Sequence, residues 1–177
     1  MNHLSPRIKR AVQAGDLLES SAQNIDLMLR SSADRTVTES IEELIENEAW
    51  AELNDRFFRT LAFGTGGLRG RTIGKKVTSA EQGSAQGAER PEHPCVGTNA
   101  MNFFNISRAT QGLAYYVREY HAKYGLSGRP KLVIANDTRF FSPEFANLAA
   151  KVASENGVDV CLFDGPRSTP QLSFTVR

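Results

Sequence analysis

The stretch Phe63-Gly64-Thr65-Gly66-Gly67-Leu68-Arg69-Gly70 decides how this chain is interpreted, because four of its eight residues are glycine. Glycine costs backbone entropy, so such a run is disfavoured inside a helix or strand and is typical of backbone that approaches another group closely. The one charged side chain, Arg69, suits phosphate, which backbone N–H groups and a guanidinium bind together. A tight turn with a solvated arginine explains the same residues equally well. Neither GxxxxGK[ST] nor GxGxxG is present, so the two common nucleotide loops are not supported.

Length and composition predict one globular domain. The chain has 177 residues and a formal net charge of +1, so no general attraction to nucleic acid or to an anionic membrane is expected. No apolar run is long enough to span a bilayer, and the first residues lack the pattern of a signal peptide. Cys95 and Cys161 have no metal-ligand spacing. We therefore expect a cytoplasmic protein with reduced thiols, and a core position for Cys161 in a strand.

The first 58 residues predict a helical arm. Leu18, Ala22, Ile25 and Leu29 fall on one helical face. Thr36, followed three residues later by Glu39, is a candidate capping box. Six glutamates are spread over this arm, and their spacing, without a histidine, predicts a solvated face and no metal site. They are Glu39, Glu42, Glu43, Glu46, Glu48 and Glu52.

The rest of the chain alternates between strand and helix patterns. Strands are expected near 61–63, 96–104, 131–135 and 158–163, and helices after Asn105, from Ser142 and from Thr169. This order predicts a layered α/β sheet with right-handed crossovers. The apolar residues of the first of these helices occupy one expected inner face: Ile106, Ala109, Leu113, Tyr116, Val117 and Tyr120.

Several ordered motifs resemble one family. With the glycine-rich stretch they look like the first of four domains of the α-D-phosphohexomutases, the phosphoglucomutase/phosphomannomutase family, in the long branch that includes phosphopentomutase-like enzymes. The matching segments are Gly97-Thr98-Asn99-Ala100-Met101-Asn102, Thr110-Gln111-Gly112-Leu113, Asn136-Asp137-Thr138-Arg139, Ser142-Pro143-Glu144-Phe145-Ala146 and Ser168-Thr169-Pro170.

The resemblance implies an architecture. It is a three-layer α/β/α domain with a mixed sheet at residues 59–177, incomplete before its last strand, preceded by the helical arm at 1–58. Residues from about 72 to 95 depart from the family as an insertion, and their Gly, Ser, Ala and Gln content predicts a flexible segment. Asp137 and Arg139 stand where a strand should end, and a local pair that shapes the turn is the favoured interpretation.

The resemblance also implies a function. Such an enzyme interconverts sugar 1-phosphates with 6-phosphates or 5-phosphates in carbohydrate metabolism, through a phosphoserine and a bisphosphorylated intermediate. Thr65, Gly66, Gly67 and Arg69 would bind phosphate, and Arg69 would support catalysis. The family's Thr-Ala-Ser-His-Asn-Pro serine loop and its Asp-Gly-Asp-Gly-Asp-Arg metal loop do not occur in these 177 residues. No cofactor is therefore expected in this chain, Mg²⁺ is implied for the parent enzyme, and the isolated chain is expected to be inactive.

Two other interpretations remain open. One is a stand-alone, non-catalytic protein that binds a partner, such as a full-length mutase. The other is a small nucleotide-binding domain, which the absence of both nucleotide loops disfavours. A phosphosugar is the expected ligand of the parent, and self-association through an uncovered sheet edge is expected of this chain.

Overall fold

The computed structural model describes residues 6–64 and 67–176. Internal contacts divide the chain into two compact units, Met1–Asn102 and Phe103–Arg177. This division is made on packing alone, so the boundary near residue 58 between the arm and the α/β domain stays a prediction.

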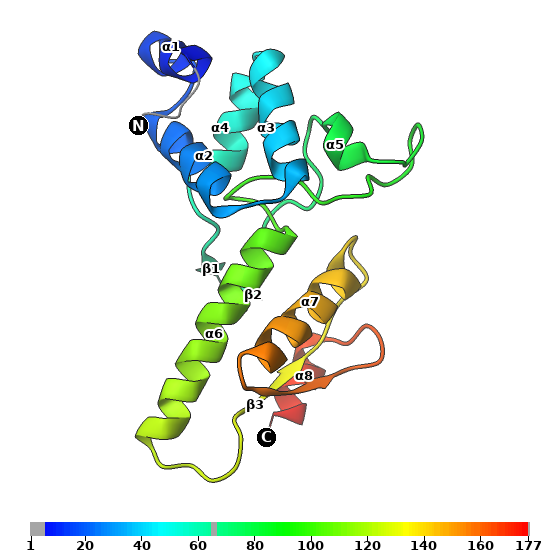
Figure 1. Cartoon of the computed structure of the whole chain (residues 1–177). Coiled ribbons are helices and arrows are strands. Elements are labelled where there is room, and N and C mark those ends of the chain that lie inside the picture. Colours follow the sequence, from blue (N-terminus) through cyan, green and yellow to red (C-terminus); the bar gives the residue numbers. More distant parts are fainter. Residues whose placement is uncertain (1–5, 65–66, 177) are drawn as a thin grey trace. The chain divides into compact units, whose positions relative to one another are not determined.

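The first unit is built on four helices (Figure 1): α1 (Pro6–Ala14), α2 (Glu19–Ser31), α3 (Arg35–Glu46) and α4 (Trp50–Phe57). Their inner faces carry fully buried apolar side chains, including Ile25, Ile41, Leu53 and Phe57, each 0% exposed. The expected helical arm is therefore present. The capping box expected at Thr36 is wrong, because Asp34 caps α3 by accepting a hydrogen bond from the Thr36 backbone N–H at 2.9 Å.

Residues 96–102 form no strand, contrary to the sequence prediction. A single parallel bridge joins Ala100 to Arg71. Other backbone groups of this segment form hydrogen bonds outside any strand. Asn99 N donates to Arg56 O, near the end of α4, at 2.9 Å, and Thr98 O accepts from Leu61 N, in a loop, at 2.7 Å. Their hydrogen-bonding capacity is met without a ladder, so the apolar pattern of this stretch reflects burial alone.

The predicted insertion contains a short helix, α5 (Ser79–Gln82), with a complete capping box between Thr78 and Glu81. Both of these side chains are 1% exposed, and the Thr78 hydroxyl lies 2.8 Å from that of Ser40 in α3. Ser79 N also donates to the Glu43 carboxylate at 2.7 Å. These polar contacts were not foreseen from a composition poor in apolar groups. Residues 83–90 are mostly exposed, and the flexibility expected of the insertion stays a prediction.

The second unit alternates helix and strand: α6 (Phe103–Lys123), β3 (Lys131–Ile134), α7 (Ser142–Glu155), β4 (Asp159–Leu162) and α8 (Thr169–Thr175). β3 and β4 pair in parallel, with Lys131 opposite Asp159 and Ile134 opposite Leu162. Since α7 connects them, β3, α7 and β4 form a βαβ unit of the kind that the sequence predicted. Asn105, the predicted cap of the first helix, lies inside α6.

The core of the second unit is small. Ala114 from α6, Ala153 from α7 and Val158 before β4 are each 0% exposed and pack together. The predicted inner face of α6 is wrong in part, because Leu113, Tyr116 and Tyr120 are 47%, 63% and 48% exposed, whereas Ile106, Thr110 and Ala114 are buried at a spacing of four. Cys161, expected in the core, is exposed near the end of β4.

Within the described residues, no helix combines the length and the apolar character needed to cross a membrane.

Candidate phosphate-binding site

The glycine-rich stretch folds into a hairpin whose two short strands are β1 (Phe63–Gly64) and β2 (Gly67–Leu68). They pair antiparallel, with Phe63 opposite Leu68 and Gly64 opposite Gly67. Gly67 has a φ of +148°, which residues with a side chain rarely adopt. Two predicted phosphate ligands, Thr65 and Gly66, lie outside the described residues.

The close backbone approach predicted from the glycines is found at Gly70. A Cβ at this position would lie 3.0 Å from Leu61 Cδ1, 3.1 Å from Met101 N and 3.3 Å from Ala100 C. The backbone after the hairpin therefore packs directly on the chain's own segment around residue 100. A glycine is needed at 70 for packing, whatever the hairpin binds.

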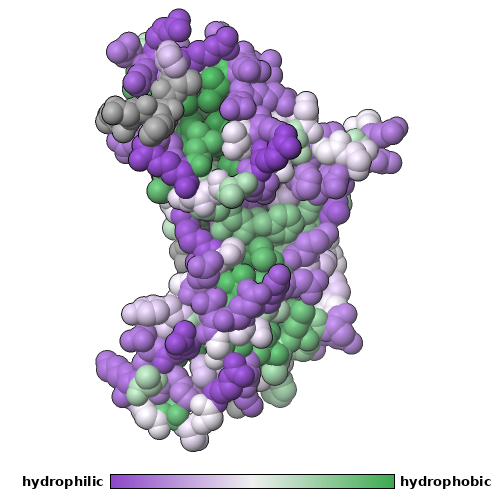
Figure 2. Space-filling view, in the orientation of Figure 1, coloured by the Kyte–Doolittle hydropathy of each residue, from purple (hydrophilic) through white to green (hydrophobic). Residues whose placement is uncertain are grey.

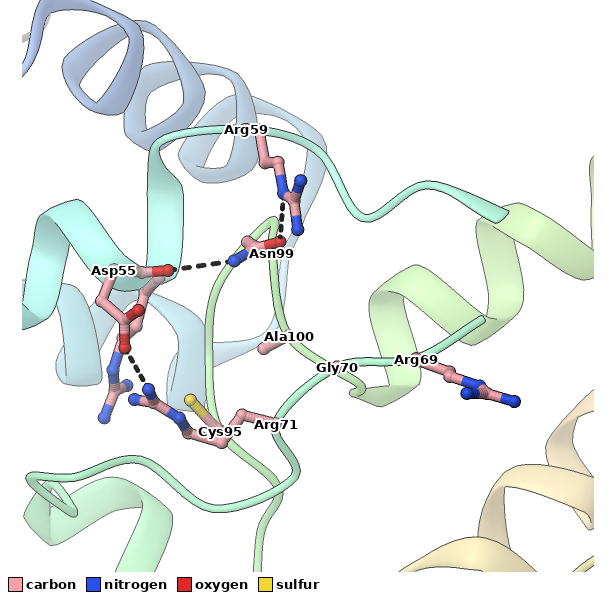
Figure 3. Close-up of a pocket in the computed structure, with 9 residues that line it drawn as sticks. Asp55, Arg59, Arg69, Gly70, Arg71, Cys95, Asn99 and Ala100 are labelled. Carbon is pink, nitrogen blue, oxygen red and sulfur yellow. Dashed lines mark hydrogen bonds and ion pairs between the residues drawn. The ribbon is translucent and has the colours of Figure 1, made fainter. Parts of the chain in front are cut away.

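Arg69, the predicted catalytic and phosphate-binding residue, directly follows β2 and is exposed. Figure 3 shows its guanidinium pointing away from Asp55, Arg59 and Asn99. Among the residues that the structure describes, Arg69 has no hydrogen-bond or ion-pair partner. The guanidinium is thus available to an oxyanion without first breaking an internal contact.

A buried ion network lies behind the hairpin. Arg56 in α4 is 2% exposed and donates to Glu52 Oε1 at 2.8 Å and to Glu81 Oε1 at 2.5 Å. It also donates to the backbone carbonyls of Val96, at 3.2 Å, and Lys76. Glu81 in turn accepts from Val96 N at 2.7 Å. Helix α4, helix α5 and the segment before Asn102 are therefore joined through one arginine.

Arg71 links this network to the hairpin, which it follows by three residues. Its guanidinium is paired with the Asp55 carboxylate, and its Nη1 lies 3.6 Å from Glu52 Oε1. Its carbonyl accepts from Met101 N at 2.9 Å. The carboxylates of α4 thus hold the side chain of Arg71, and Met101 N holds its backbone carbonyl.

These contacts overturn one sequence prediction and add residues that it missed. Glu52, assigned to a solvated face, is 5% exposed and ion-paired. The four-residue spacing of Glu52 and Arg56 was a signal that could have pointed to this pair. The Thr78-x-x-Glu81 spacing was a local signal for the capping box of α5, but the contacts of Glu81 and Asn99 with α4 come from distant segments and have no local signal.

A cavity of about 180 Å³ opens beside Arg71 (Figure 3). Its walls come from the end of α4, the chain after the hairpin, and residues 95–100. The lining residues are Asp55, Arg56, Arg59, Arg69, Gly70, Arg71, Cys95, Asn99 and Ala100. Burial raises the pKa of the Cys95 thiol to about 12, so this side chain is protonated and unreactive at neutral pH.

Asp137 and Arg139, in the second unit, form the local pair that the sequence favoured. Arg139 Nε donates to Asp137 Oδ2 at 2.7 Å, and Arg139 N donates to Asp137 Oδ1 at 3.0 Å. The side-chain hydrogen bond from Arg139 lowers the pKa of Asp137 from its usual range. Asp137 N donates to Ser142 Oγ at 3.1 Å, so the pair shapes the turn that leads into α7.

The described residues contain no group of three or more His, Cys, Asp or Glu side chains placed to hold a metal ion.

Comparison with known proteins adds two findings. Residues 94–177 match the family model described as phosphoglucomutase/phosphomannomutase, alpha/beta/alpha domain I. The chain is also 31% identical over 137 residues to a phosphoglucomutase of Staphylococcus epidermidis strain RP62A, and 31% identical over 121 residues to one of Staphylococcus haemolyticus. These matches cover 77% and 68% of the chain. No solved structure matches significantly.

The matches confirm the predicted α/β/α class and extend beyond the domain model into the helical and hairpin region. They span 20% and 17% of the two staphylococcal relatives, so the chain corresponds to about a fifth of their length. The described strands form one antiparallel pair in the first unit and one parallel pair in the second.

Proposed function

Because this chain belongs to the phosphoglucomutase/phosphomannomutase family and carries its domain I, we propose that it is the part of a sugar-phosphate mutase that contacts the transferring phosphoryl group. The parent would interconvert sugar 1-phosphates with 6-phosphates or 5-phosphates through a phosphoserine and a bisphosphorylated intermediate. The observation that carries the proposal is Arg69, an exposed guanidinium directly after the glycine hairpin with no ion-pair partner among the described residues.

Arg69 would stabilise the negative charge on the phosphoryl oxygens, since a guanidinium offers two parallel N–H donors to a phosphate. The N–H groups of the hairpin, with Thr65, Gly66 and Gly67 as proposed ligands, would add to this charge stabilisation. The packing of Gly70 and the pairing of Arg71 with Asp55 support the proposal, because they hold the hairpin base in place before substrate binds.

The isolated chain is expected to have no mutase activity. The serine loop that would supply the nucleophile does not occur in these 177 residues. A coupled assay of the purified chain with glucose 1-phosphate, glucose 1,6-bisphosphate and magnesium checks this expectation. Product formation above a protein-free blank would contradict it.

We also propose that the chain is cytoplasmic and associates with itself through its second unit. The described residues pair no further strand with β3 or β4, so each strand has a free edge. Leu113, Tyr116 and Tyr120 follow one another at helical spacing on α6, Tyr124 comes directly after its end, and all four are about half exposed or more. Figure 2 shows hydrophobic residues reaching the surface in patches between polar ones.

Sedimentation velocity across a range of protein concentrations measures this association. We expect the weight-average sedimentation coefficient to rise with concentration, and replacing Tyr116 and Tyr120 with serine to weaken the rise. A monomer at every concentration would contradict self-association.

The exposed face and free edges also favour a second candidate function, a stand-alone interaction protein derived from a mutase domain. Genomic context separates the two candidates. In a mutase, the reading frame continues into the serine loop, whereas in an interaction protein it does not.

A further inference from the structure

The cavity beside Arg71 holds a second arginine, Arg59, whose position is fixed by protein contacts alone. Arg59 Nε donates to Asn99 Oδ1 at 3.1 Å, and its guanidinium carbon lies 4.9 Å from the centre of the Phe58 ring. Asn99 is itself held by α4, since Asn99 Nδ2 donates to Asp55 O at 3.2 Å (Figure 3). The side chain of Arg59 therefore needs little further ordering to bind a ligand.

Two donors of the cavity have unused hydrogen-bonding capacity. Among the described residues, nothing accepts a hydrogen bond from the terminal nitrogens of Arg59. Arg71 Nη1 is buried and also has no hydrogen-bond acceptor among these residues, because its distance of 3.6 Å from Glu52 Oε1 exceeds that of a hydrogen bond. A buried donor without an acceptor is costly, and a ligand oxygen would remove that cost.

Not every arginine at the cavity has a carboxylate partner among the described residues. Arg56, Arg59, Arg69 and Arg71 line the cavity together with Asp55, but the Arg69 guanidinium points away from it (Figure 3). Arg56 and Arg71 are paired with Glu52, Glu81 and Asp55. Arg59 has no carboxylate partner among the described residues, so its charge is open to an anion.

We propose that this cavity binds one small oxyanion of the phosphate class between Arg59 and Arg71, with Asn99 as the residue that orients Arg59. The flat guanidinium fork matches two oxygens of a phosphate. The volume of about 180 Å³ admits such a group, whether free or at the end of a sugar phosphate. Arg69 points away from this space, so the subsite is separate from the contact proposed for the hairpin.

The experiment is a titration of the isotope-labelled chain with inorganic phosphate, followed by amide chemical shifts. Saturable shifts are expected at Asn99 and Arg71. Arg59→Gln should weaken the affinity at least about tenfold, as expected for loss of a charge-assisted hydrogen bond. Arg69→Gln should leave the shifts at Asn99 in place. Arg35→Gln is the matched control, because the Arg35 side chain is 90% exposed and its ion-pair partner among the described residues is the exposed Glu39.

Equal phosphate affinity of the unmutated chain and the Arg59→Gln variant would overturn the proposal. Equal weakening by Arg35→Gln would also overturn it, because it would indicate non-specific charge attraction. Arg59→Lys, which keeps the charge and loses the fork, should bind with intermediate affinity. Binding of glucose 1-phosphate at the same amides supports the site as a sugar-phosphate site, and binding of inorganic phosphate alone supports it as a site for the free ion. Neither result depends on mutase activity, so failure of the proposed function would leave this test intact.

Discussion

Replacing Arg56 with methionine is expected to lower the free energy of unfolding by about 3–5 kcal/mol at neutral pH. Methionine fills much of the apolar volume of the arginine but leaves the Glu52 and Glu81 carboxylates buried without their cation. Glu52 and Glu81 are 5% and 1% exposed, so water cannot replace the lost hydrogen bonds. The penalty comes from these uncompensated buried charges, because the intact pair itself contributes less than its removal costs.

Urea unfolding followed by circular dichroism measures this effect. Arg35→Met is the matched control, since it removes an exposed i,i+4 pair with Glu39 and should change stability by no more than about 0.5 kcal/mol. The triple variant Glu52→Gln, Arg56→Met and Glu81→Gln removes all three charges together and should recover much of the loss.

A stability difference below about 1 kcal/mol between the unmutated chain and Arg56→Met would show that the network is not an essential part of the first unit.

The helices outside the insertion were predictable from the sequence because each has a local signal. The apolar spacing of α2, the Ser-Pro start of α7 and the Thr-Pro start of α8 are all properties of adjacent residues, and the structure confirms these three helices. The βαβ unit followed from two short apolar runs on either side of α7. Parallel pairing of its strands then required only the handedness of the connection.

The predictions that failed depend on contacts between distant segments. Residues 96–102 were predicted to form a strand from an apolar pattern that reflects their burial. Their hydrogen-bond partners include side chains and the end of α4, so no strand ladder forms. Glu52 read as solvated because its neighbours in sequence are charged, yet Lys75 N donates to it at 3.1 Å from another segment. Composition cannot reveal such a partner.

The candidate site was predictable only in part. The glycines and Arg69 were recognisable from the motif. The hairpin accounts for the glycine at position 67, and close packing accounts for the glycine at position 70. The contact between Arg59 and Asn99 has no local sequence signal, since it spans 40 residues. The role of Arg69 as a phosphate ligand stays a prediction.

Arg69→Gln is expected to abolish most of the response of the hairpin to a bisphosphorylated sugar. The guanidinium is the charged donor of the motif, and charge-assisted hydrogen bonds to phosphate are about twice as strong as neutral ones. Gln keeps a polar side chain at the same exposed position, so folding should be unchanged. Arg59→Gln serves as the comparison, because it alters the cavity and leaves the hairpin intact.

The most direct test is therefore an amide-shift titration of the labelled chain with glucose 1,6-bisphosphate, read at Gly67, Leu68, Arg69 and Gly70. If the hairpin is a phosphoryl-contacting element, these amides shift saturably, and Arg69→Gln removes most of the change while Arg59→Gln does not. A folded sample in which these four amides do not respond, or respond equally in the Arg69→Gln variant, would contradict the role proposed for the hairpin.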